Sequence, residues 1–107
     1  MSLEGTIIKE GSTRLLVPPL ISERGPGRVE GKVFFNRQMA FNRDVTVVMF
    51  RSVLRPRRCL DAMAATGARG VRICTEAPGE YQFLINDREP FACEYIRETV
   101  RLNSIGN

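Results

Sequence analysis

The chain has 107 residues, of which 43% are hydrophobic and 26% charged, and its formal net charge is +4. This length provides material for one domain and the composition is that of a globular protein, so a disordered tail and a second large core are excluded. No apolar run is long enough to cross a membrane, and the N-terminus lacks the pattern of a secretory signal. We therefore expect a soluble cytoplasmic protein that does not contact a membrane.

Metal ligands and histidine chemistry are scarce. The chain has three cysteines, none of them in a CxxC pair, and no histidine. A structural zinc site takes about four such ligands, so no metal site is expected. A histidine general base and a histidine triad are excluded as well. We interpret the cysteines as small buried hydrophobic residues in a reducing compartment.

Positive charge is concentrated between residues 28 and 58, which hold eight basic residues and two acidic ones. Such a segment can hold phosphates by displacing their counterions. It can also be a solvated helix face whose long side chains cover apolar surface. On charge alone, both nucleic-acid binding and a solvated face stay open.

The first predicted elements are a β-hairpin and a helix. Two short apolar or β-branched runs, 6–9 and 13–17, flank a turn that contains glycine, which predicts the hairpin. A loop is expected over 22–27, and Asn36 can cap a helix that extends to about residue 54, before Pro56. Helical spacing of apolar residues marks one face of this helix, formed by Phe41, Val45, Val48 and Met49.

From residue 58 onward the pattern alternates between strand and helix. A strand over 58–63, a turn with two glycines over 64–70 and a short helix are followed by a strand over 81–85 and a helix from Pro90. The order βαβα predicts a right-handed parallel unit.

The chemistry is expected at the carboxyl ends of these two strands, where ligands bind in open α/β sheets. Gly67 and Gly70 would let the backbone approach a ligand closely, because a Cβ atom there would occupy its space. Asp87, at the end of the second strand, could accept both hydroxyls of a ribose. The turn lacks G-x-G-x-x-G and no GxxxxGK[ST] occurs, which disfavours a dinucleotide and excludes a nucleoside-triphosphate loop. From these residues alone, adenosine binding and an ordinary α/β turn both stay open.

Ordered motifs along nearly the whole chain resemble a known family. They are Val33-Phe34-Phe35-Asn36, Met39-Ala40-Phe41-Asn42-Arg43-Asp44, the segment 60–72 with its D-A-x-x-A-T-G-x-R-G turn, Asn86-Asp87 and Arg101-Leu102-Asn103. Together they look like the N-terminal part of the tRNA guanine-N2 dimethyltransferases. The chain departs from the family at Arg37, where proline is usual.

The resemblance implies an α/β fold, namely a partial Rossmann-like S-adenosylmethionine-dependent methyltransferase fold preceded by a β-hairpin and a helix. Residues 1–32 would form the N-terminal hairpin and loop, and residues 33–107 the first part of the Rossmann-like domain. The expected cofactor is S-adenosyl-L-methionine and the expected partner is tRNA.

The resemblance also implies roles for individual residues. Those expected at the cofactor are Arg43, Arg69, Asp87, Asp61 and Gly67. Asp87 would take the ribose, Asp61 would organise the pocket, and an arginine could pair with the methionine carboxylate. For each arginine the alternative is an ion pair with a neighbouring acid. Phe34 could clamp the target base, or it could be a core aromatic beneath the helix.

The family's catalytic motif, an acid followed by proline and an aromatic residue, has no match in the chain. We therefore expect a fragment without catalytic residues of its own, inactive alone, from an enzyme that methylates the exocyclic amine of a tRNA guanine. Exposed apolar surface would make self-association plausible. Two alternatives stay open: a non-catalytic RNA-binding or interaction module that uses the basic segment 28–58, and an α/β domain for another adenosine-containing ligand.

Overall fold

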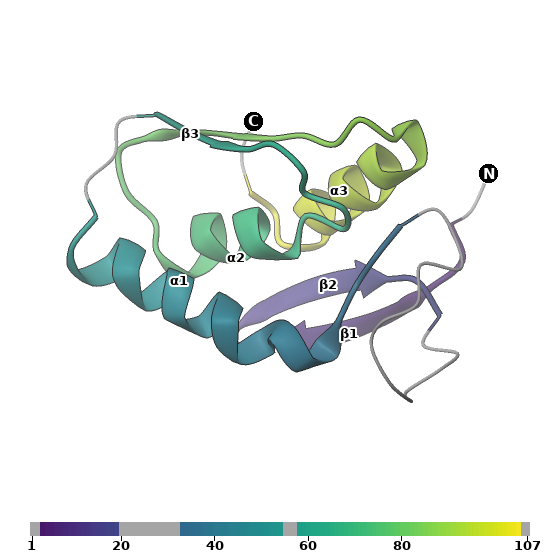
Figure 1. Ribbon diagram of the computed structural model, residues 1–107, viewed down its shortest axis with the longest axis horizontal. Coiled ribbons are helices and arrows are strands. Elements are labelled where there is room, and N and C mark those ends of the chain that lie inside the picture. The colour runs from purple at the N-terminus through teal and green to yellow at the C-terminus, as the bar shows by residue number, and fades with distance from the viewer. Residues whose placement is uncertain (1–2, 20–32, 55–57, 106–107) are drawn as a thin grey trace.

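The computed structural model describes residues 3–19, 33–54 and 58–105 of the chain. Within these ranges, a small antiparallel hairpin and a small parallel sheet lie on opposite sides of helices α2 and α3 (Figure 1). The predicted loop over 22–27 and the predicted stop at Pro56 lie outside the described residues. So does the boundary between residues 1–32 and 33–107, which remains a prediction.

The hairpin consists of strands β1 (Thr6–Glu10) and β2 (Thr13–Val17) and confirms the expected first element. The strands pair from Glu10 opposite Thr13 to Thr6 opposite Val17. Gly11 opens the two-residue turn with a φ of +62°, a left-handed conformation that glycine adopts without strain. Leu15 and Val17 are completely buried, so β2 belongs to the core.

Helix α3 (Pro90–Leu102) covers the outer edge of β2 and satisfies its backbone groups. The Leu16 N–H donates to Thr99 Oγ1 over 3.1 Å, and the Arg14 N–H donates to Asn103 Oδ1 over 2.9 Å. The Asn103 amide donates back to the Arg14 carbonyl over 2.7 Å. An edge strand with paired groups offers no template for another strand, so these side chains fix the hairpin to the rest of the chain.

A short 3₁₀ turn (Arg37–Met39) leads into helix α1 (Ala40–Ser52). Asn36 caps this turn, because its Oδ1 accepts a hydrogen bond from the Gln38 N–H over 2.8 Å. The buried positions of α1 are Arg43 and Val47. Its apolar face is instead exposed, with exposed fractions of 43–75% for Met49, Val45, Val48 and Phe41. An apolar helix face normally packs against another part of the protein. The described residues do not cover this one.

The predicted βαβα unit is confirmed as strand β3 (Arg58–Asp61), helix α2 (Ala68–Glu76), strand β4 (Gln82–Ile85) and α3. β3 and β4 pair in parallel, with Asp61 opposite Ile85. Alternate residues face the helices, because neighbouring side chains of a strand point to opposite faces. Leu60 and Leu84 lie on the other face and are 61% and 64% exposed, so that face of the sheet is uncovered.

A buried network of charges joins the hairpin to α1 and α2. Arg72 on α2 is 3% exposed and pairs with Glu10 at 3.0 Å, Asp44 at 2.6 Å and Glu76 at 2.8 Å. Thr13 Oγ1 also donates to Glu76. Burial raises the pKa values of Glu10 and Glu76, but hydrogen bonds and charges from the arginines outweigh it and hold both pKa values below the usual range.

The three cysteines are free thiols, as expected, but they are half-buried rather than fully buried. Burial raises the pKa values of Cys59 and Cys74, which keeps these thiols protonated and unreactive near neutral pH. The described part of the chain holds no cluster of side chains suited to a metal ion. It also contains no helix of the length and apolarity needed to traverse a bilayer.

Candidate functional site

The segments that follow β3 and β4 lie side by side and are hydrogen-bonded to each other. The Asn86 N–H donates to the Asp61 carbonyl, and the Ala64 N–H donates to the Asn86 carbonyl, each over 2.9 Å. The carboxyl ends of neighbouring parallel strands meet at one sheet edge. The fold therefore brings the predicted glycine turn and the predicted acid together, as their spacing indicated.

Asp87 accepts hydrogen bonds at this edge of the sheet through both of its carboxylate oxygens. Oδ2 accepts the Ala65 N–H over 2.8 Å, and Oδ1 accepts the Glu89 N–H over 2.9 Å. Ala65 has a φ of +53°, a left-handed conformation that costs a residue with a Cβ atom about 1–2 kcal/mol. The carboxylate thus stabilises a strained turn, a role that the sequence pattern did not reveal. Each oxygen keeps a further lone pair that a ligand hydroxyl can use.

Gly67 and Gly70 are required for contacts within the protein. Gly67, at the start of α2, has a φ of +84°, and a Cβ atom there would lie 3.0 Å from Ile96 Cγ1. At Gly70 a Cβ atom would lie 2.9 Å from Ile85 Cγ1 and 3.2 Å from Asp61 Oδ2. A Cβ atom at either position would therefore meet protein atoms, and the close approach of a ligand to this backbone remains a prediction. These glycines let α2 approach α3 and β4, and cofactor binding at Gly67 remains a prediction.

Asp61 contributes a carboxylate that is only partly satisfied. Its Oδ2 is buried and has no hydrogen-bond partner in the described residues. Burial raises the pKa of Asp61, as does the charge of Asp87, while the charge of Arg69 and the Gly70 N–H oppose the shift. A buried acceptor without a donor is unfavourable. The atom is therefore suited to accept a hydrogen bond from a bound ammonium group or an ordered water.

The two arginines expected at the cofactor have different surroundings. Arg43 is 6% exposed and forms a bidentate ion pair with Glu10, Nε to Oε2 at 2.7 Å and Nη2 to Oε1 at 2.9 Å. Its Nη2 also donates to the Asn36 carbonyl over 3.1 Å. This is the ion-pair alternative, and it leaves Nη1 alone to reach a ligand. A role for Arg43 at the cofactor remains a prediction.

Arg69, in the first turn of α2, keeps its charge available. Its Nη1 donates to the hydroxyl of Thr46 over 2.7 Å. Among the described residues no carboxylate lies within ion-pair distance of it, whereas Arg43 and Arg72 are both neutralised. An arginine that is half-buried and has no ion-pair partner among the described residues is a strong site for a carboxylate or a phosphate.

Phe34 is 38% exposed and therefore does not lie in the core beneath the helix. The neighbouring Phe35 takes that position, because it packs on the cluster of Leu15 and Val17. The guanidinium of Arg43 lies 4.7 Å from the centre of the Phe35 ring. The exposed ring of Phe34 is thus accessible, and its contact with a target base remains a prediction.

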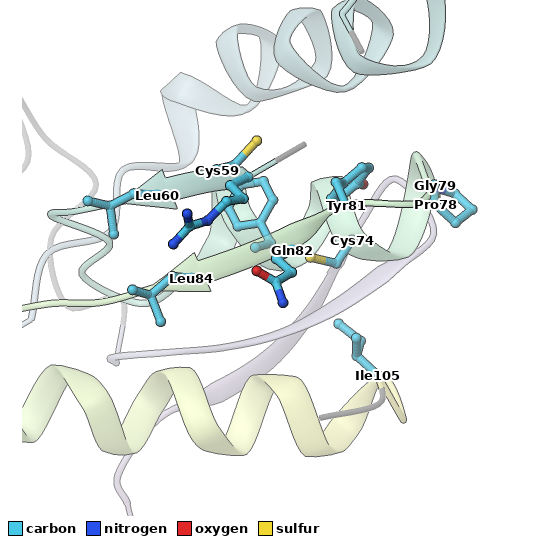
Figure 2. Close-up of a pocket in the computed structure, with 11 residues that line it drawn as sticks. Cys59, Leu60, Cys74, Pro78, Gly79, Tyr81, Gln82, Leu84 and Ile105 are labelled. Carbon is cyan, nitrogen blue, oxygen red and sulfur yellow. The ribbon is translucent and has the colours of Figure 1, made fainter. Parts of the chain in front are cut away.

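A separate open groove lies along the uncovered sheet, nearer to the start of the strands (Figure 2). Its walls come from β3, β4, the end of α2 and the segment after α3, and they include Cys59, Cys74, Tyr81, Gln82 and Ile105. None of the predicted site residues lines it. Because the predicted acids and the glycine turn lie at the carboxyl edge and not in this groove, we place the candidate site at that edge.

A parallel βαβ unit with a glycine turn beside an acid at the end of the second strand is the arrangement of a Rossmann-like α/β fold. The family model described as N2,N2-dimethylguanosine tRNA methyltransferase matches residues 12–107. The chain belongs to this family, which confirms the resemblance inferred from its motifs.

Curated relatives named tRNA (guanine(26)-N(2))-dimethyltransferase agree with this assignment. The protein from Pyrococcus furiosus is 40% identical over 106 residues, which are 99% of this chain and 26% of the relative. The protein from Methanoregula boonei is 48% identical over 93 residues, 85% of this chain and 24% of the relative. The chain therefore spans about a quarter of the length of the relatives it matches.

Two solved structures share the fold. Trm1 from Pyrococcus horikoshii, solved in complex with S-adenosyl-L-methionine, is 35% identical with a TM-score of 0.76 over 95% of this chain and 24% of its own. A putative transferase from the same organism has a TM-score of 0.66 over 94% of this chain and 32% of its own. It is 16% identical and is evidence for the fold alone. The predicted fold class is thus confirmed.

Proposed function

We propose that this chain forms the cofactor-binding part of a tRNA guanine-N2 dimethyltransferase and binds S-adenosyl-L-methionine at the carboxyl edge of β3 and β4. The observation that carries the proposal is the combination, at one edge, of an arginine without an ion-pair partner among the described residues and two carboxylates with acceptor capacity, namely Arg69, Asp61 and Asp87. The cofactor has a group for each of them. Membership of the family and the likeness to Trm1 in complex with S-adenosyl-L-methionine support the choice of cofactor.

The proposed roles follow from the chemistry of each side chain. Arg69 pairs with the methionine carboxylate through N–H groups that no described residue accepts. Asp87 accepts the ribose hydroxyls with the lone pairs left over from its two backbone contacts. Asp61 accepts from the ammonium group, directly or through a water, and so satisfies its buried Oδ2. Gly67 shapes the turn beneath the ligand, and Arg43 reaches it only through Nη1.

S-adenosylmethionine supplies an electrophilic methyl group on a sulfonium. We propose that the whole protein presents the exocyclic amine of a tRNA guanine to this methyl group, with Phe34 contacting the base. The described residues bind and orient, which lowers the entropic part of the barrier, and none of them is assigned as a catalytic acid or base. The proposal includes a cytoplasmic location, where tRNA is found.

The alternative of an RNA-binding module based on the segment 28–58 is weakened by one observation. Arg43, which belongs to that segment, is buried in an ion pair and cannot face a phosphate backbone with its full charge. Arg28, Lys32, Arg55 and Arg57 lie outside the described residues. We therefore propose tRNA as the substrate of the whole protein rather than as the ligand of this segment alone.

Calorimetric titration of the chain with S-adenosylmethionine tests the proposed site. We expect saturable binding that Arg69→Ala weakens by about 10–100-fold, because it removes a hydrogen-bonded ion pair worth about 1.5–3 kcal/mol. Arg51→Ala, which removes an exposed arginine from the last turn of α1, is the matched control and should leave the affinity unchanged. A folded chain that binds no cofactor contradicts the proposal.

We also propose that the chain self-associates through its uncovered apolar surfaces. These are the exposed face of α1, with Phe41 and Val48, and the open face of the sheet, with Leu60 and Leu84. Light scattering should give a mass that rises above 12.1 kDa with concentration. The double variant Leu60→Lys, Leu84→Lys should lower that mass. A monomer at high concentration is the contrary result.

A further inference from the structure

The hydroxyl of Thr46 is the polar anchor of Arg69, although the two residues lie on different helices. Arg69 Nη1 donates to Thr46 Oγ1 over 2.7 Å. The Thr46 hydroxyl in turn donates to the Asn42 carbonyl over 3.3 Å, one turn earlier in α1. With its proton directed at the helix backbone, the oxygen presents its lone pairs to the guanidinium. The Thr46 hydroxyl is therefore held by two hydrogen bonds, one donated to the backbone of α1 and one accepted from Arg69.

Thr46 is a neutral hydrogen-bond partner, so it holds Arg69 without neutralising its charge as a carboxylate would. Arginine loses about 2 kcal/mol of side-chain entropy when its rotamer is fixed, and a hydrogen bond to a hydroxyl offsets part of this cost before any ligand arrives. Arg43 and Arg72 are fixed by carboxylates, and their charge is neutralised in the process. Thr46 fixes Arg69 and leaves the positive charge for a ligand.

The structure assigns Thr46 as a positioning residue, which orients Arg69 toward the carboxylate of the methionine part of S-adenosylmethionine. This inference rests on the proposed function, since it needs the cofactor at that edge. It goes beyond it by adding a residue of α1 that acts through Arg69 and that the sequence motifs did not indicate. Thr46 contacts the arginine and not the cofactor, so its effect is confined to the ligand group that Arg69 binds.

The test compares two ligands that differ by one group. Decarboxylated S-adenosylmethionine keeps the adenosine, the sulfonium and the amine, and lacks only the carboxylate. By calorimetry, Thr46→Val should weaken binding of S-adenosylmethionine by about 3–10-fold, as expected for the loss of one positioning hydrogen bond. Binding of the decarboxylated ligand should not change. Thr46→Ser, which keeps the hydroxyl, should bind S-adenosylmethionine like the unchanged chain.

Thr75→Val on α2 is the matched control, because the Thr75 hydroxyl is buried and has no hydrogen-bond partner among the described residues. This variant should bind both ligands with unchanged affinity. An equal loss for both ligands in Thr46→Val means a structural role and overturns the inference, and so does no loss for either. If the unchanged chain binds neither ligand, the proposed function itself fails. These outcomes distinguish failure of the inference from failure of the site.

Discussion

Replacing Arg72 by methionine is expected to destabilise the fold by about 3–5 kcal/mol, the range found when one partner of a buried ion pair is removed. Methionine fills a similar volume but leaves Glu76 without its main counter-charge and Glu10 with Arg43 alone, and each of these glutamate side chains is only 10% exposed. A domain of this size is stable by only about 5–15 kcal/mol. The loss is a large fraction of this stability, so urea unfolding followed by circular dichroism should show a clearly lower unfolding midpoint for the variant at pH 7.

The loss of stability caused by the Arg72 substitution should depend on pH. The folded-state pKa values of Glu10 and Glu76 lie below the ordinary glutamate value of 4.5, so their stabilisation is present above pH 4.5 and is lost as the pH falls through the folded-state values. The penalty of the Arg72 variant should therefore shrink in acid, where both carboxyls become neutral. Arg101→Ala, which breaks the exposed pair with Glu98, is the control and should unfold like the unchanged chain. Equal stability of the Arg72 variant at pH 7 would show that the network contributes nothing.

Asp87→Ala is expected to reduce S-adenosylmethionine binding by about 100-fold or more. The substitution removes the proposed ribose acceptor, and it also leaves the N–H groups of Ala65 and Glu89 without their partner. Two hydrogen bonds to a charged acceptor account for a loss of this size. Calorimetry measures the affinity. Thermal unfolding measures the smaller loss of stability that Asp87→Ala causes in the turn.

Glu89→Ala is the control for Asp87→Ala, since only the backbone of Glu89 takes part and its side chain forms no cap at the start of α3. This variant should bind the cofactor like the unchanged chain. Asp87→Asn should lie between the two, because its amide keeps one acceptor oxygen and offers a donor where the second N–H needs an acceptor. Unchanged affinity of Asp87→Ala would remove Asp87 from the site.

The order of the elements could be predicted from the sequence because it depends on local patterns. The hairpin and the βαβα unit are specified by short apolar runs, glycine turns and prolines, and the structure confirms both. The packing of α1 could not be predicted in this way. Its buried side contains Arg43, which is tolerated there because Glu10, 33 positions earlier, supplies a bidentate counter-charge. Apolar periodicity carries no information about such a distant partner.

The candidate site, like the fold, could be predicted only in part. Asp61, Asp87 and the glycine turn could be placed at one edge, because the ends of parallel strands meet there whatever the details of packing. The hydrogen bond from the Ala65 N–H to Asp87 and the hydrogen bond from Arg69 to Thr46 could not be predicted, since both depend on contacts between separate elements. The packing contacts of the glycines could not be predicted for the same reason. The neighbours that exclude a Cβ atom are Ile96 and Ile85, which approach only in the folded chain.

The most direct test of the proposed cofactor site is a nuclear magnetic resonance titration of the ¹⁵N-labelled chain with S-adenosylmethionine. The proposed site predicts that amide shifts concentrate in the two edge segments, residues 64–70 and 86–89, and in α1 around Thr46. Arg69→Ala should reduce them at the same cofactor concentration. Shifts confined to the groove near Cys74 and Gln82 (Figure 2), or a folded chain whose spectrum does not change, would contradict a cofactor site at the carboxyl edge of β3 and β4.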